Sequence, residues 1–152
     1  MYELTKELTK PEIVALSEAL DDEYRSWATY DQVIEDFGEV RPFFNIRDAE
    51  SRHIEALCAL YVRYGLSIPE NPWPGKVERY ASLQEACAAG AAAELANGAM
   101  YERLIAVTRH PDMLKVLRNL QEASQQRHLP AFQRATQRSA GGDGCHEHRR
   151  GR

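Results

Sequence analysis

The chain has 152 residues, the size of one ordinary domain, and its 19 Lys and Arg residues against 23 Asp and Glu residues give a formal charge of −4. Nothing in this mildly acidic balance suggests a nucleic-acid-binding protein, which would need a basic stripe. No apolar run approaches the ~20 residues of a membrane helix, and three widely spaced cysteines fit reduced thiols better than a disulfide framework, so we expect a cytoplasmic protein with neither nucleic-acid nor membrane partners.

Start and stop signals divide the chain into four predicted helices. Thr9-Lys10-Pro11-Glu12 is a capping box with proline near the first helical position, and Ser82-Leu83-Gln84-Glu85 is a second capping box. Gly38 and Gly65 are placed to end the first and second helices, and His110-Pro111-Asp112 starts the fourth. The predicted helices cover about residues 11–37, 42–64, 83–107 and 111–139.

The lengths of the connections predict how these helices are joined. The first and second helices, and the third and fourth, are joined by short loops, which makes each pair antiparallel. The link between the second and third helices is long, and prolines and glycines between Gly65 and Gly75 forbid a helix there. We therefore expect an all-α, antiparallel four-helix bundle over residues 1–140, built as two hairpins joined by a long crossover, and a flexible tail over residues 141–152.

Each predicted helix carries a residue able to bind metal near the middle of its apolar face. These candidate ligands are Glu23, Glu50, His53, Glu94 and His128. An unpaired buried carboxylate is costly and tends to protonate. Three carboxylates and two imidazoles meeting in one layer therefore predict a shared cation. Two alternatives stay open: a buried Glu–His hydrogen-bond network without metal, and helices rotated so that these residues face water.

The two predicted hairpins share a sequence spacing between a glutamate and a tyrosine. Tyr30 follows Glu23 by seven residues, and Tyr101 follows Glu94 by the same interval. Two helical turns place each tyrosine on the same face as its glutamate. Each hydroxyl is therefore a candidate hydrogen-bond donor to a metal-bound carboxylate, the alternative being an ordinary core aromatic residue.

Several segments carry a resemblance to a known family. They are Asp22-Glu23-Tyr24, Pro42-Phe43-Phe44-Asn45-Ile46, Ala49 to Ile54, Pro69-Glu70-Asn71-Pro72-Trp73, Glu94 to Tyr101, Ala123-Ser124 and His128 to Phe132. In these segments the chain resembles the ferritin-like superfamily, and within it the prokaryotic domain of unknown function 2202. The resemblance implies a dinuclear iron or manganese site. In this chain it would use Glu23, the Glu50-x-x-His53 pair, Glu94 and His128.

One departure from the ferritin-like pattern concerns the fourth helix. The family's pattern has a glutamate three residues before the histidine, where this chain has Gln125, with Ser124 one residue further back. The missing carboxylate leaves one or two metal ions open, with Gln125 near a weakly held second ion. Pro130 removes a helical hydrogen bond two residues after His128, and we expect a kink there.

These observations leave three functional hypotheses. The first is an iron protein, with manganese or zinc as alternatives, that acts as a ferroxidase or reduces peroxide, its partner being a small oxidant such as oxygen or peroxide. The second is a metal-binding, storage or scaffold module without turnover, which the missing carboxylate favours. The third is a helical partner-binding domain without metal. Exposed helix faces leave a homodimer open, and Cys145 to His148 in the tail are either a weak metal-binding segment or disordered.

Overall fold

The computed structural model describes residues 7–141, and these residues form helices and no strand. The helices are α1 (Lys10–Phe37), α2 (Phe43–Arg63), α3 (Leu83–Ala106), α4 (Pro111–Ala123), η1 (Ser124–His128) and α5 (Leu129–Gly141). The prediction of an all-α fold is confirmed, and the helix ends fall close to those predicted. The predicted Cys/His tail lies outside the described residues. No helix in the described part is both long enough and apolar enough to cross a bilayer.

The local signals at the ends of α1 explain its length. The Thr9 hydroxyl accepts the backbone N–H of Glu12, and the Glu12 carboxylate accepts the backbone N–H of Thr9, so the capping box is fully formed. At the other end Gly38 has a φ of 95°, a conformation that residues with a Cβ rarely adopt. A capped N-terminal turn and a glycine stop at the C-terminus thus bound a helix of 28 residues.

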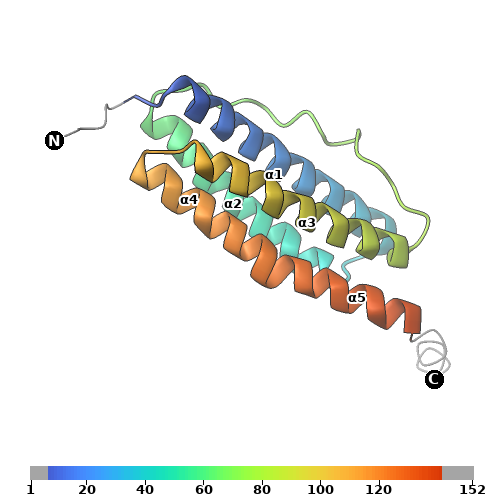
Figure 1. Cartoon of the computed structure of the whole chain (residues 1–152). Coiled ribbons are helices and arrows are strands. Elements are labelled where there is room, and N and C mark those ends of the chain that lie inside the picture. The colour runs from blue at the N-terminus through green and yellow to red at the C-terminus, as the bar shows by residue number, and fades with distance from the viewer. Residues whose placement is uncertain (1–6, 142–152) are drawn as a thin grey trace.

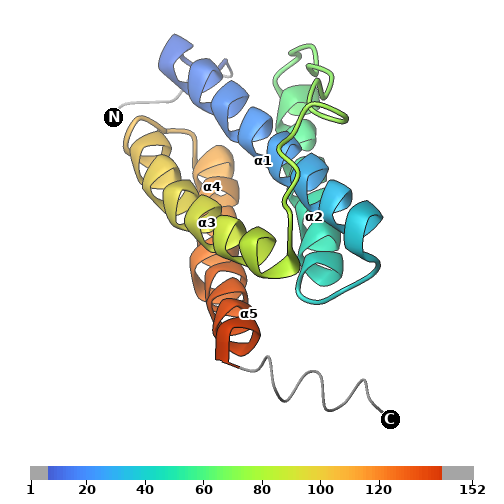
Figure 2. The ribbon, with the colours of Figure 1, turned by 90° about the vertical axis from the view of Figure 1, so that its right-hand side faces the viewer.

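The helices lie side by side, and consecutive helices joined by short loops run in opposite directions (Figure 1). The segment between α2 and α3 runs back along the outside of α1 (Figures 1 and 2). Several contacts hold this crossover segment, residues 64–82, to α1, and three of them involve side chains spread along its length. These three are the Tyr24 hydroxyl to the Pro69 carbonyl at 2.7 Å, the Trp73 indole to Asp21 at 3.0 Å, and the Arg79–Asp36 ion pair at 2.6 Å.

The apolar core is divided into two clusters. One contains Leu16, Leu20, Leu57, Tyr101 and Leu117. The other contains Tyr30, Ile46, Cys87, Phe43 and Phe132. Along every helix the predicted metal ligand falls between residues of the two clusters, as Glu23 does between Leu20 and Tyr30. The candidate site is therefore a polar layer inside the core.

A π-helical turn lies just before Pro130, the residue at which the sequence predicts a kink. In η1 the backbone N–H of Leu129 bonds to the carbonyl of Ser124, five residues earlier. Pro130 has no N–H to offer the carbonyl of Gln126. The helix continues through the proline to Gly141, so the disturbance is confined to the turn that ends at His128.

Candidate metal centre

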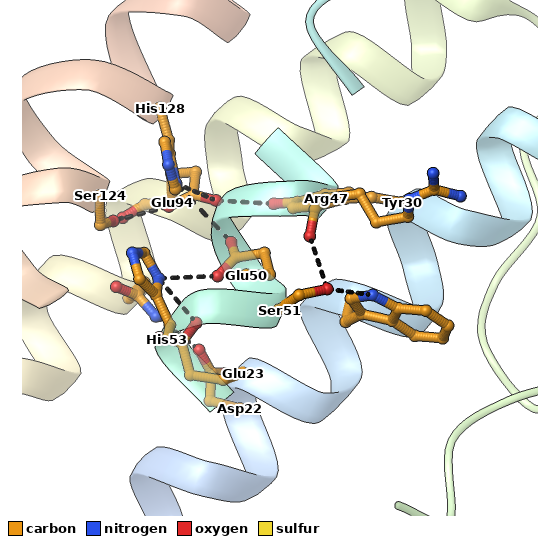
Figure 3. Close-up of polar contacts among 12 residues, drawn as sticks. Asp22, Glu23, Tyr30, Arg47, Glu50, Ser51, His53, Glu94, Ser124 and His128 are labelled. Carbon is orange, nitrogen blue, oxygen red and sulfur yellow. Dashed lines mark hydrogen bonds and ion pairs between the residues drawn. The ribbon is translucent and has the colours of Figure 1, made fainter. Parts of the chain in front are cut away.

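The five predicted ligands meet in the polar layer, and each of the helices α1, α2, α3 and η1 contributes one or two of them (Figure 3). Glu23 comes from α1, Glu50 and His53 from α2, Glu94 from α3 and His128 from η1. The four residues other than His53 are at most 4% exposed, and the His53 side chain is 13% exposed. The alternative in which these side chains face water is therefore wrong.

The ligands form two triads that share Glu50. The first is Glu23, Glu50 and His53, and the second is Glu50, Glu94 and His128; in each, one ligand atom per residue lies within 4.8 Å of the others. His53 Nδ1 is 3.3 Å from Glu23 Oε1 and 3.1 Å from Glu50 Oε1. The two imidazole rings stack with centroids 5.6 Å apart. One carboxylate, Glu50, thus stands between two sets of nitrogen and oxygen donors.

The second triad is more open than the first. His128 Nδ1 is 3.6 Å from Glu50 Oε2 and 3.7 Å from Glu94 Oε2, beyond hydrogen-bond distance. This nitrogen is buried and has no hydrogen-bond partner. Buried polar atoms are nearly always paired, so an unpartnered imidazole nitrogen facing two carboxylates fits a cation between them.

The two tyrosines bond across the hairpins. The Tyr30 hydroxyl on α1 donates to Glu94 Oε2 on α3 at 2.8 Å, and the Tyr101 hydroxyl on α3 donates to Glu23 Oε2 on α1 at 2.6 Å. Burial and the neighbouring carboxylates raise the pKa of both phenols well above 10. Both therefore stay protonated as donors and fix the orientation of the carboxylates.

Ser124, rather than Gln125, reaches the side chain of Glu94. Its hydroxyl donates to Glu94 Oε1 at 2.6 Å, so both oxygens of Glu94 are held. Gln125, the predicted neighbour of the site, donates instead to the backbone carbonyl of Glu94 at 2.6 Å. The π-helical turn explains the exchange, because it adds a residue to the turn and brings Ser124 to the buried face.

Two polar residues next to the site were missed by the sequence reasoning. Asn97 donates to Asp22 at 2.6 Å, and Asn97 is 6% exposed. Asn97 stands on the predicted inward face of the third helix, one turn from Glu94, and this position was the available signal. Asp22 stands next to Glu23 in the sequence, and nothing in a single sequence shows that its side chain also turns toward the interior.

The carboxylates of the first triad titrate very differently. Burial by itself would raise the pKa of Glu23, but hydrogen bonds with Glu50, His53 and Tyr101 outweigh it and lower that pKa from 4.5 to about 2. Burial and the charge of Glu23 raise the pKa of Glu50 well above its ordinary value. Without a cation the pair is thus stable with one proton between its carboxyl groups.

The donor set could hold a metal ion. Carboxylate oxygens and imidazole nitrogens are ligands that iron, manganese and zinc all accept. The cysteines of the described residues do not take part, because the clusters contain none. The chemistry of the donors therefore fits a divalent or trivalent cation without selecting one.

Comparisons with known proteins place the fold and leave the function open. No protein-family model matches the chain, and no curated protein matches it. The chain is similar to the crystal structure of hypothetical protein MJ0754 from Methanococcus jannaschii DSM 2661, with a TM-score of 0.77 and 21% sequence identity over 92% of this chain and 87% of that one. At this identity the likeness shows a shared fold alone.

Proposed function

We propose that this chain is a ferritin-like four-helix bundle, related to the domain of unknown function 2202, that binds iron at Glu23, Glu50, His53, Glu94 and His128. The observation that carries the proposal is Glu50 standing between two buried triads, one of which contains the unpartnered Nδ1 of His128. The connectivity of two hairpins and one crossover supports the bundle assignment. Manganese and zinc are the alternative metals.

The arrangement of the triads supports one or two ions. Two ions would share Glu50, as the two triads do. The three carboxylates carry at most three negative charges, and Ser124, the residue of η1 that bonds the Glu94 carboxylate, is uncharged. Two divalent ions would thus leave a positive charge to be balanced from outside, and a single ion would not.

The activity we propose is oxidation of ferrous iron or reduction of peroxide. Bound ferrous iron would supply the electrons that reduce oxygen or peroxide. Tyr30 and Tyr101 hold Glu94 and Glu23 in place by O–H donation. The apolar clusters on both sides of the polar layer keep bulk water out.

A second candidate function is metal binding without turnover, in storage or as a scaffold. The serine hydroxyl in place of a fourth carboxylate favours it, because a hydroxyl is a weaker and uncharged ligand. Consumption of oxygen or peroxide after addition of ferrous iron separates the two functions. Bound metal without consumption of the oxidant would favour the second.

The test of metal binding is Glu50→Ala, with Glu55→Ala as its control. Glu55 lies on the same helix and is exposed. At a free metal concentration of about 100 times Kd, binding stabilises the native state by about 2.7 kcal/mol. For a chain of this size, that raises Tm by about 5–10 °C. We expect metal to raise Tm in the wild type and Glu55→Ala and not in Glu50→Ala, and equal iron content in all three proteins would end the assignment.

A further inference from the structure

A cavity of about 320 Å³ lies between α1, α3 and the crossover segment. Binding pockets for small molecules span about 300–1,000 Å³, so this one is at the small end of the range. Its volume suits a molecule with one ring and excludes a dinucleotide or a flavin. The cavity is separate from the polar layer, since none of the five proposed ligands lines it.

The wall on α3 is made of small residues. Ala86, Ala89, Gly90 and Ala93 all line the cavity, and their spacing places them on one side of the helix. Aromatic rings supply other parts of the wall: Tyr30 from α1, and Trp73 and Tyr80 from the crossover segment. A cavity lined by small residues on one helix and by aromatic rings fits an aromatic ligand, because rings stack or meet edge to face.

The charges around the cavity cancel. Arg25 and Lys76 supply two positive charges, and Asp22 and Glu78 supply two negative ones. Arg25 is already paired with Asp22 at 2.7 Å and lies 5.7 Å from the centre of the Trp73 ring. The lining therefore carries no net formal charge, and the cavity as a whole does not favour an anion or a cation over a neutral ligand.

Hydroxyl groups give the cavity its polar contacts. Ser26 and Thr29 line the cavity from α1, and each offers a donor and an acceptor. Tyr30, which donates its own O–H to Glu94, is 2% exposed and forms the wall between the cavity and the proposed metal centre. A ligand in this cavity would thus lie one side chain away from a proposed metal ligand.

From these observations we propose that the cavity beneath the crossover segment binds a small neutral aromatic alcohol of the phenol class. The ring would lie between the small residues of α3 and the rings of Trp73 and Tyr80. The hydroxyl would exchange hydrogen bonds with Ser26 or Thr29. The proposal goes beyond the proposed function and does not require metal, because no proposed ligand lines the cavity.

Trp73 gives a direct signal for occupation of the cavity. The chain has two tryptophans, and Trp27 does not line the cavity. In a Trp27→Phe background, Trp73 is the remaining tryptophan, and it can be excited at wavelengths longer than those absorbed by tyrosine or phenol. We expect phenol to change its emission with a saturable concentration dependence, and benzoate and benzylamine, the charged analogues, to bind more weakly.

Two variants of α3 locate the binding. Ala89→Met fills the cavity, while Ala92→Met makes the same change at an exposed position that does not line it. The longer side chain would take up space that the ring needs, so Ala89→Met should weaken phenol binding by about tenfold, or about 1.4 kcal/mol. Ala92→Met should leave the affinity unchanged.

The outcomes are distinct from those of the metal experiments. Phenol should bind equally well before and after treatment with a chelator, even if iron binding fails. An emission change that does not saturate, or one that is equal in Ala89→Met and Ala92→Met, would overturn the site. Tighter binding of benzoate or benzylamine than of phenol would overturn the neutral ligand class.

Discussion

Glu12 carries the most concentrated set of hydrogen bonds outside the candidate metal centre. Its side chain is fully buried, with 0% exposed surface. One carboxylate oxygen accepts the backbone N–H groups of Arg109 at 2.7 Å and His110 at 3.0 Å. The other accepts the backbone N–H of Thr9 at 2.9 Å and faces the His110 ring nitrogen at 2.9 Å. The start of α1 is thereby tied to the loop that precedes α4.

The perturbation we consider is Glu12→Gln. An amide has one oxygen, so whichever way it turns, an NH₂ group replaces an oxygen that now receives two bonds. Two donors, in bonds that are partly or fully buried, are then left without an acceptor, at a cost of about 1–3 kcal/mol each. We expect the free energy of unfolding to fall by about 3 kcal/mol, and Tm to fall by about 6–12 °C.

The same contact predicts a dependence on pH. Burial would raise the pKa of Glu12, but the hydrogen bonds from His110, Thr9 and Arg109 outweigh it and lower the pKa from 4.5 to about 2. Because the folded-state pKa lies below the unfolded one, the stabilisation is fully present above about pH 4.5 and is lost as the pH falls toward 2. The stability difference between wild type and Glu12→Gln should therefore shrink over that window.

Denaturant titrations at several pH values measure both effects. The control is Glu85→Gln, since Glu85 takes the same third position in α3 but is exposed. It should change stability by less than about 0.5 kcal/mol. Equal stability of Glu12→Gln and Glu85→Gln, or a difference between wild type and Glu12→Gln that is independent of pH, would refute the reasoning.

The remaining predictions concern the hydrogen bonds and the packing around the polar layer. Tyr101→Phe removes the bond to Glu23, and we expect metal affinity in a titration to fall by about 10–100-fold with the helical content unchanged. Gly90→Ala would bring a Cβ to 2.8 Å from the Phe132 ring, and unfolding in denaturant should become easier by about 1–3 kcal/mol. Gly98→Ala should cost less, because its Cβ would meet a flexible glutamine side chain.

The controls for these changes lie nearby. Tyr80→Phe removes a hydroxyl that is not bonded to any proposed ligand, so metal affinity should stay the same. The Phe132 ring is held between Tyr30 and Phe43, with centroids 5.3 and 5.1 Å away, and has little room to move. If Gly90→Ala were as mild as Gly98→Ala, this account of the packing would be wrong, and unchanged metal affinity in Tyr101→Phe would contradict the role given to its hydroxyl.

Much of the fold could be predicted because its signals are local. A capping box, a glycine stop and a proline-rich link act within a few residues, so Thr9, Gly38 and Ser82 fix helix ends without knowledge of the tertiary structure. The burial of Glu23 and Glu94 could also be predicted, since each stands among apolar residues at helical spacing. Periodicity indicates which face of a helix is buried, and that was sufficient to bring the five ligands together.

The partners across helices could not be predicted in the same way. Spacing places Tyr30 on the face of Glu23, yet its hydroxyl bonds Glu94 on α3, because long side chains reach across the core to the neighbouring helix. The exchange of Gln125 for Ser124 depends on a single π-helical turn, which shifts every later residue around the helix axis. Neither feature leaves a periodic signal in one sequence.

The polar layer conflicts with the rest of the core. Replacing buried charged groups with apolar residues of similar size is often neutral or stabilising, and the clusters on both sides show that this chain can pack apolar residues well. Such conflicts with local rules are expected where a protein has a functional site. Apolar replacement of Glu23, Glu50 and Glu94 together should therefore keep the metal-free fold, while loss of any one should remove metal binding. A stable triple variant together with single variants that bind no metal would show that the polar layer serves metal binding. A triple variant that fails to fold would show that the layer is needed for folding.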